Sequence, residues 1–191
     1  MQRIGIYGGS FDPVHLGHLL VAQAAIEELG LERLFLVPAA LSPFKQSAPP
    51  TSGEIRAQML RLAFAGRTNC EVDEQELRRE GVSFSVDTVR GYAARFPQAQ
   101  LFYLIGADNV AALPQWRSAE ELAKLAEFAV IPRPGDAQIP LPAPFRGVTL
   151  RGWPLGVSSS EIRARVKASK SFAHLVPSVV AEVIRNNPLY L

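Results

Sequence analysis

The sequence has a single cysteine and no long hydrophobic run. One cysteine excludes a framework of disulfide bonds and a cysteine-rich zinc module, and it is typical of proteins from a reducing compartment. No apolar stretch reaches the roughly 18 residues that a transmembrane helix needs. Residues 1–6 do not resemble the start of a secretory leader. We therefore expect a soluble, cytoplasmic protein with no membrane partner.

An excess of charge of one sign is also missing. The 191 residues include 20 Lys and Arg against 18 Asp and Glu, which gives a net charge of +2. A protein that binds duplex DNA usually carries a basic stripe, so nucleic acid is not an expected partner. Hydrophobic residues make up 48% of the chain, which is enough for a core and excludes overall disorder. At this length, and without internal repeats, we expect a single domain over residues 1–191.

Apolar segments alternate with helical patterns along the whole chain, which is typical of an α/β protein with a parallel sheet. Segment 101–105 is apolar on both faces, as a buried parallel strand should be. Ser85 is expected to cap the helix that follows it. The predicted strands are 3–7, 34–37, 70–72, 101–105, 128–131 and 148–150, and the predicted helices are 17–30, 53–65, 85–96, 159–168 and 178–185.

Two proline-rich stretches interrupt this alternation. Pro43, Pro49 and Pro50 follow the second predicted strand, and five of the thirteen residues at 132–144 are proline. Proline disfavours both helix interiors and interior strands. Ligands in parallel sheets bind beyond the carboxyl ends of the strands, so we interpret the first stretch as a loop at the rim of a site. The second is interpreted as a plain connection.

The most informative segment is 8–19, Gly-Gly-Ser-Phe-Asp-Pro-Val-His-Leu-Gly-His-Leu, which links the first strand to the first helix. Gly8 and Gly9 allow a tight turn and a close approach of the backbone to a ligand. The start of a helix offers free N–H groups and a positive dipole end, which suit an anion. His15 and His18 are three residues apart and therefore share a face of the first turn. The segment predicts a phosphate pocket with two imidazoles directed into it.

Each part of this segment has a plainer interpretation. A pair of glycines after a strand is often only a tight turn, and two histidines can be solvated or belong to the core. Two histidines could also bind a metal, but a structural zinc site needs about four ligands. Only His174 and Cys70 remain as further candidates, both far along the chain, so no protein metal site is predicted.

The segment closely resembles the first signature of the HxGH nucleotidyltransferases, a superfamily of adenylyltransferases related in fold to class I aminoacyl-tRNA synthetases. The second signature of that superfamily, a serine-rich turn followed by Ile-Arg, is similar to residues 157–163, Val-Ser-Ser-Ser-Glu-Ile-Arg. Taken alone, this second segment could be a simple helix cap. The resemblance implies a Rossmann-like, doubly wound parallel sheet with helices on both faces. It also implies transfer of AMP from ATP to a phosphate acceptor, with release of pyrophosphate.

Within the superfamily, nearly the whole chain resembles the bacterial nicotinate-nucleotide adenylyltransferases. Residues 106–108, Gly-Ala-Asp, and the later Trp116 are similar to a Gly-x-Asp and Trp element of that family. Residues 83–88 are similar to its Ser-Tyr-Thr segment, and residues 130–135 to its Arg-Pro-Gly strand exit. Residues 43–45, Pro-Phe-Lys, fall where the family has Pro-His-Lys.

The resemblance implies that His15, His18 and Arg163 are the catalytic residues. Arginine suits the β- and γ-phosphates because its fork of donors matches phosphate oxygens. Asp108 lies just past a strand end, where a carboxylate can accept hydrogen bonds from ribose hydroxyls, although it could equally cap the following helix. The implied ATP-binding residues are Gly8, Gly9, Ser10, Phe11, His15, His18, Gly106, Asp108, Ser159, Ser160 and Arg163.

The acceptor, nicotinate mononucleotide, is implied to contact a second group of residues. Trp116 offers a flat face for a pyridinium ring, with a role as a core anchor as the alternative. The sequence departs from the family at Phe44, which lacks any hydrogen-bonding group, and at Phe84. Ser85 replaces a threonine but keeps a hydroxyl. The implied acceptor-binding residues are Lys45, Ser85, Trp116 and Arg133, of which Lys45 could instead be a solvated surface residue.

The resemblance thus implies that ATP and nicotinate mononucleotide give nicotinate adenine dinucleotide and pyrophosphate, a step of NAD biosynthesis. Magnesium is expected to bind with ATP, mostly through phosphates and water. The alternatives are an adenylyltransferase for nicotinamide mononucleotide or phosphopantetheine, and a non-catalytic nucleotide-binding protein of the same fold. Cys70 and Trp153 are interpreted as packing residues. The oligomeric state stays open, with a homo-oligomer among the alternatives.

Overall fold

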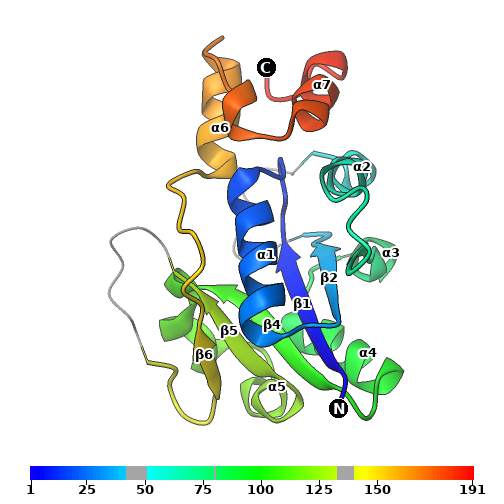
Figure 1. The fold of residues 1–191 in the computed structure, drawn as a ribbon, viewed down its shortest axis with the longest axis vertical. Helices are drawn as coiled ribbons and strands as arrows, with labels where there is room; N and C mark the ends of the chain where they lie inside the picture. Colours follow the sequence, from blue (N-terminus) through cyan, green and yellow to red (C-terminus); the bar gives the residue numbers. More distant parts are fainter. Residues whose placement is uncertain (42–50, 80, 133–139) are drawn as a thin grey trace.

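The computed structural model describes residues 1–41, 51–79, 81–132 and 140–191. A six-stranded sheet forms its centre (Figure 1), and every pair of neighbouring strands in it is parallel. Its order is β3-β2-β1-β4-β5-β6. The strands are β1 (Arg3–Gly9), β2 (Arg33–Pro38), β3 (Cys70–Val72), β4 (Gln100–Gly106), β5 (Glu127–Ile131) and β6 (Gly147–Thr149).

The strand order places a switch point between β1 and β4. The chain winds outward from β1 through β2 to β3, then returns to add β4 on the other side of β1. The loops that leave β1 and β4 therefore diverge and leave a crevice at the carboxyl ends of these two strands, where ligands bind in sheets of this kind. The predicted Rossmann-like parallel sheet is confirmed. The predicted glycine–histidine segment follows β1, and the predicted site residues Asp108 and Trp116 follow β4.

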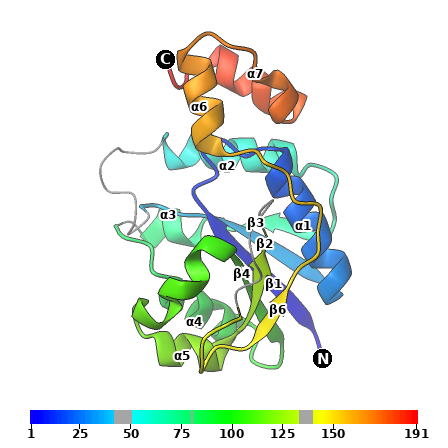
Figure 2. The same cartoon turned by 90° about the vertical axis from the view of Figure 1, so that its left-hand side faces the viewer.

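Helices cover both faces of the sheet. Figure 2 shows the sheet between α1 on one side and α4 and α5 on the other. The helices are α1 (Leu16–Leu29), α2 (Gly53–Ala63), α3 (Gln75–Arg79), α4 (Ser85–Arg95), α5 (Ala119–Leu125), α6 (Ser159–Lys167) and α7 (Ser178–Asn186), with 3-10 helices η1 (Ala107–Gln115) and η2 (Ala173–Leu175).

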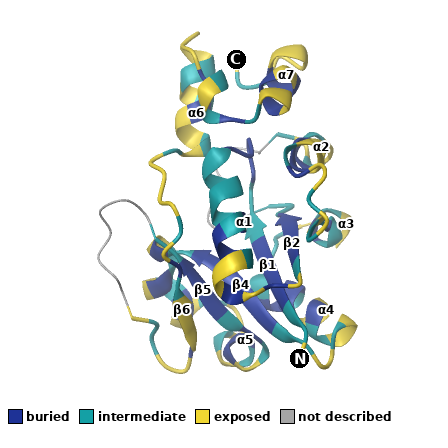
Figure 3. Cartoon of the chain, viewed as in Figure 1, coloured by how far each residue is buried: buried dark blue, intermediate teal, exposed yellow. Residues whose placement is uncertain are grey.

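The strand residues divide between two hydrophobic clusters because successive side chains of a strand point to opposite faces. Leu34 and Leu36 of β2 face a cluster that includes α1, α2 and α7, whereas Phe35 and Val37 face one that includes α4, η1 and α5. Segment 101–105 of β4 is buried on both faces, as predicted. Figure 3 shows the resulting distribution, with buried strands inside and exposed residues on the outer helices.

Helices α6 and α7 lie beyond the carboxyl end of the sheet, beside the amino-terminal end of α1 (Figure 1). Ile162 of α6 and Val180 of α7 are fully buried in the same cluster as α1 and α2. The chain reaches α6 through residues 150–158, which run from β6 past α1 (Figure 1). Because of this path, the second signature segment arrives next to the first.

Three sequence-based expectations differ from the structure. The cap position of α4 is Phe84, and Ser85 is the first helical residue, its hydroxyl 2.8 Å from the Tyr103 hydroxyl. Trp153 is 52% exposed, so its interpretation as a packing residue is wrong. The short elements α3, η1 and α5 were not predicted, because segments of five to nine residues show too few turns for a clear apolar period. The predicted rim loop falls at 42–50, outside the described residues.

Within the described parts of the chain, no helix is long and apolar enough to cross a bilayer.

The backbone conformation of Gly147 in β6 predicts that a side chain at this position would destabilise the edge of the sheet. Its φ of 153° lies in a region that side chains rarely adopt, and a Cβ atom there would overlap the backbone carbonyl of Phe128 in β5. We expect Gly147→Ala to lower the free energy of unfolding by at least about 2 kcal/mol in urea denaturation, because the β5–β6 pairing must shift. Gly156→Ala is the matched control, since a Cβ there meets no atom within 4 Å. Equal stabilities of the two variants would contradict this account.

Candidate active site

The loop after β1 is closely packed at its glycines. A Cβ atom on Gly8 would lie 3.0 Å from the hydroxyl oxygen of Tyr103 on β4, and one on Gly9 would lie 3.1 Å from the ring of Phe11. These contacts are tighter than ordinary van der Waals packing, so a side chain at either position would push its neighbour away. The two glycines therefore let the end of β1 sit directly against the end of β4 and let the loop turn back over itself.

His15 and His18 meet at the start of α1, as their spacing predicts. Their rings stack with centroids 3.7 Å apart and planes at 29°. The backbone N–H of His15, the cap residue, donates to Nδ1 of His18 at 3.1 Å. Because Nδ1 accepts this bond, the proton of the neutral His18 ring belongs on Nε2. The helix start thus fixes one tautomer of His18, with an N–H donor on the far side of the ring.

His15 is buried, with 7% of its surface exposed, and its Nδ1 atom has no hydrogen-bond partner within the described part of the chain. Burial lowers the pKa of His15 to about 4, so the ring is neutral at pH 7. Gly17 makes room for this ring, because a Cβ there would lie 3.1 Å from both the His15 ring and Val157. The glycine between the two histidines therefore permits the stacked pair.

Phe11 packs against the ring of His18. Its ring lies edge-on to His18, with centroids 4.9 Å apart, and edge-on to Tyr7 at 5.3 Å. Only 1% of Phe11 is exposed. The side chain of Phe11 therefore packs against His18 and Tyr7, and the expectation that Phe11 binds ATP stays a prediction.

Helix α6 is bonded to the loop after β1. Ser159 Oγ donates to the carbonyl of Pro13 at 2.9 Å, and Arg163 Nη1 donates to the carbonyl of Asp12 at 2.7 Å. Arg163 Nη2 lies 3.2 Å from the hydroxyl of Ser160, which accepts from it. The two signature segments are thus in direct contact although about 150 residues separate them. Arg163 is half-buried, and its guanidinium is directed at the loop.

The end of β4 presents the other side of the crevice. Asp108 is exposed in the first turn of η1, where its Oδ1 accepts from the Asn109 side-chain amide at 3.2 Å. A Cβ atom on Gly106 would overlap this carboxylate, so the glycine allows Asp108 to fold back over the strand end. The cap of η1 is Gly106, which leaves Asp108 inside the helix.

Ser85 and Trp116 lie around Tyr103. The Ser85 hydroxyl is 2.8 Å from the Tyr103 hydroxyl, and the Trp116 ring is edge-on to Tyr103 with centroids 6.4 Å apart. Burial raises the pKa of Tyr103, so its hydroxyl keeps its proton. The structure thus brings two of the four predicted acceptor-binding residues together, beside Gly8. Lys45 and Arg133 lie outside the described residues.

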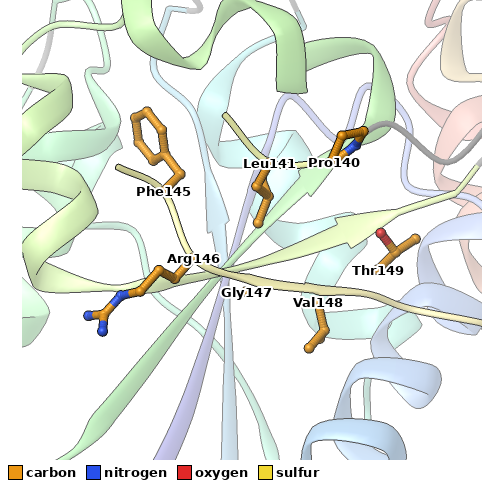
Figure 4. A pocket seen from close by; sticks show the side chains of 7 residues that line it. All are labelled: Pro140, Leu141, Phe145, Arg146, Gly147, Val148 and Thr149. Atoms are coloured by element: carbon orange, nitrogen blue, oxygen red, sulfur yellow. The ribbon is translucent and has the colours of Figure 1, made fainter. Parts of the chain in front are cut away.

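Two surface hollows lie away from the histidines. One, of about 460 Å³, follows the outer edge of β6 and is lined by Pro140, Leu141, Phe145, Arg146, Gly147, Val148 and Thr149 (Figure 4). Among the described residues that line it, Arg146 alone carries a charge. The other, of about 450 Å³, borders Trp116 and the start of α5.

Sequence reasoning missed a buried charged layer under the loop. Arg56 of α2 is 1% exposed, and its Nη1 donates to the carbonyl of Ser10 at 2.7 Å. Asp12 is 6% exposed and accepts bonds from outside its own loop. Glu76 is buried behind Ser85, accepts from Thr88 Oγ1 at 2.5 Å, and has a pKa raised by its burial. Arginine is rarely buried, so nothing in the pattern of α2 indicated the position of Arg56.

The described residues contain no group of three or more His, Cys, Asp or Glu side chains that could hold a metal ion. Near the histidine pair the nearest carboxylate in sequence, Asp12, is already engaged by protein donors. The donor set around the loop is cationic or N–H, which fits phosphate oxygens.

Known proteins resemble the whole chain. A "probable nicotinate-nucleotide adenylyltransferase" of Opitutus terrae is 41% identical over 192 residues, covering 99% of this chain and 98% of the relative. The nicotinate-nucleotide adenylyltransferase of Bacillus subtilis is 38% identical over 191 residues, covering 100% and 99%. In fold, the chain is similar to Plasmodium falciparum nicotinic acid mononucleotide adenylyltransferase complexed with NaAD, with a TM-score of 0.78, 18% identity and coverage of 100% and 98%.

The sequence profile of the cytidylyltransferase-like family matches residues 6–165, from β1 into α6. This span includes both signature segments and all of the sheet except the first three residues of β1. The chain therefore belongs to the cytidylyltransferase-like family and, within it, to the nicotinate-nucleotide adenylyltransferases.

Proposed function

We propose that this protein transfers the adenylyl group of ATP to nicotinate mononucleotide and releases nicotinate adenine dinucleotide and pyrophosphate. One observation carries the proposal: the stacked His15–His18 pair and the Ser159–Arg163 turn meet on a single loop at the start of α1. The loop lies at the switch point of the sheet, where such folds bind nucleotides. The full-length similarity to nicotinate-nucleotide adenylyltransferases supports this choice of substrates.

The triphosphate of ATP would lie over the amino-terminal end of α1. The free N–H groups and the positive dipole end of this helix favour an anion. His18 would donate Nε2–H to the α-phosphate, since its Nδ1 is held by the His15 backbone. Ser159, Ser160 and Arg163 would bind the β- and γ-phosphates, and Asp108 would accept from the ribose hydroxyls.

The reaction needs no covalent enzyme intermediate. A phosphate oxygen of nicotinate mononucleotide attacks the α-phosphorus of ATP in line, and the bond from that phosphorus to the bridging oxygen of the β-phosphate breaks. The acceptor phosphate is already ionised near pH 7, so no strong general base is required. Such transfers are catalysed mainly by positioning and by stabilising charge on the phosphate oxygens. Magnesium bound to the phosphates would neutralise further negative charge.

Nicotinate mononucleotide would lie on the other side of Gly8, at the carboxyl end of β4. Trp116 offers its ring face to the pyridinium, which adds cation–π attraction to stacking. The start of α4 at Ser85 presents backbone N–H groups and a positive dipole end. A carboxylate gains more from these groups than a carboxamide does, which favours the acid over the amide. Lys45 and Arg133 are proposed to contact the acceptor phosphate.

The substrates are tested by measuring pyrophosphate release with ATP and Mg²⁺, and with each of three acceptors in parallel. We expect rapid release with nicotinate mononucleotide and much slower release with nicotinamide mononucleotide or phosphopantetheine. A preference for either of these would retain the adenylyl transfer and overturn the acceptor assignment. ATP binding without release for any acceptor would instead identify a non-catalytic nucleotide-binding protein.

The role of His18 is tested by His18→Ala. Removing a donor that stabilises transition-state charge typically lowers turnover by about 10²–10³-fold. We expect such a loss in kcat, with the ATP dissociation constant from calorimetry changing by less than about tenfold. His174→Ala, which removes a histidine of η2 outside the site, is the control and should retain activity. Equal losses of turnover and of ATP binding would assign His18 to binding alone.

The neutral state of His15 is tested by the pH dependence of stability. The unfolded chain protonates His15 near pH 6.5, whereas the folded protein resists protonation until about pH 4. Below pH 6.5 the unfolded state therefore binds more protons, and the free energy of unfolding falls as pH falls. From pH 7 to pH 4 we expect the wild type to lose roughly 3 kcal/mol more than His15→Gln in urea denaturation. Parallel curves for the two proteins would contradict a buried, neutral His15.

A further inference from the structure

Asp12 is the one acidic side chain in the loop between β1 and α1, and both of its oxygens are bonded from outside the loop. Oδ1 accepts from the hydroxyl of Tyr190 at 2.7 Å, and Oδ2 accepts from the backbone N–H of Thr51 at 3.2 Å. Only 6% of Asp12 is exposed. A buried carboxylate close to a triphosphate would repel it unless its charge were compensated.

Arg56 provides that compensation. Its guanidinium is almost fully buried and donates to the carbonyls of Ser10 at 2.7 Å and Thr51 at 2.8 Å. The charge of Asp12 favours the ionised form of Arg56 against the lowering of its pKa by burial. Backbone carbonyls satisfy Arg56, whereas Asp12 accepts from one backbone N–H and from the Tyr190 hydroxyl. Buried charges of opposite sign are tolerated when their donors and acceptors are satisfied in this way.

Three carbonyls of the loop accept hydrogen bonds from side chains outside the loop. The carbonyl of Ser10 accepts from Arg56, that of Asp12 from Arg163, and that of Pro13 from Ser159. A carbonyl that faced the nucleotide would repel phosphate oxygens, whereas an N–H attracts them. Because protein donors already engage these three carbonyls, these hydrogen bonds decide which backbone groups the loop can present to an anion.

Tyr190 follows α7 and reaches Asp12 from the far end of the described chain. Its φ of 66° places it in the left-handed region, which costs free energy for any residue other than glycine. Strain of this kind persists where the surrounding contacts hold it and often marks a functional position. Burial raises the pKa of Tyr190, so the hydroxyl stays protonated and acts as the donor to Asp12.

We propose that Tyr190 is a positioning residue for the triphosphate loop: its hydroxyl fixes Asp12 and thereby keeps the carbonyls of Ser10, Asp12 and Pro13 bonded to protein donors, where they do not face ATP. The proposal rests on the proposed function, because the loop is taken to bind the triphosphate. The residues that follow α7 thus complete the nucleotide site without touching the nucleotide. The acceptor side, around Tyr103, is outside this network.

The test is Tyr190→Phe, which removes one hydroxyl and keeps the ring. A hydrogen bond to a charged group is lost, so we expect kcat for pyrophosphate release to fall about tenfold. The ATP dissociation constant should weaken about fivefold, and KM for nicotinate mononucleotide should stay within about twofold. A purely structural loss would instead lower the melting temperature and would impair turnover and the binding of both substrates together. Leu191→Ala, at an 81% exposed neighbour, is the matched control and should behave as wild type.

Asp12→Asn provides a second variant in case the first has too small an effect on its own. If Tyr190 acts through Asp12, the double variant should lose little more kcat than Asp12→Asn alone. Wild-type kcat and wild-type ATP affinity in Tyr190→Phe, or fully additive losses in the double variant, would overturn the proposal. If wild-type protein releases no pyrophosphate with any acceptor, the proposed function fails. The role of Tyr190 is then tested by the ATP dissociation constants alone: weaker binding in Tyr190→Phe supports it, and wild-type binding contradicts it.

Discussion

Two hydrogen bonds between α6 and the loop after β1 are the contact on which the rest of the site depends. Ser159 donates to Pro13 and Arg163 donates to Asp12, across about 150 residues of sequence. Neither half has a complete site without the other, since the loop lacks a cationic side chain of its own and α6 lacks the histidines. The contact depends on the path of the chain, because residues 150–158 run from β6 past α1 and bring α6 to the loop (Figure 1). The site is therefore a property of the assembled fold.

The electrostatics of the site follow from burial more than from net charge. The chain carries only +2, yet the loop combines the dipole end of α1 with Arg163, while the buried Arg56 compensates the charge of Asp12. His15 adds no charge at pH 7, because burial lowers its pKa to about 4. If the rings of His15 and His18 were both protonated, two positive charges would lie stacked with centroids 3.7 Å apart and would repel each other. A neutral His15 avoids this repulsion. His15 thus contributes its backbone N–H, which sets the His18 tautomer.

Much of this could be predicted from the sequence, and the rest is determined by tertiary contacts. The strands, α1 and the two signature segments have strong local patterns, namely apolar runs, a helical period and glycine or serine at the turns. The cap of α4 was misplaced because the Ser85 hydroxyl is engaged by Tyr103, a residue of another element. Arg56 and Tyr190 gave no signal, because their partners are backbone carbonyls and a carboxylate that only the fold brings near. Trp153 is exposed in spite of its size, and the structure does not explain this exposure.

Tyr103 links the two halves of the site across the switch point. Its hydroxyl lies where a side chain on Gly8 would be, at the edge of the triphosphate loop, and it is bonded to Ser85 at the start of α4. Its ring meets Trp116 edge-on. Because β1 and β4 pair directly, with Ile6 opposite Tyr103, the spacing between the two proposed substrate positions is set by the sheet itself. A rigid spacing of this kind is what an in-line attack requires, since reacting atoms must be held within a few tenths of an ångström. The absence of a side chain at Gly8 is then a condition for bringing the two substrates together, in addition to the turn that it allows.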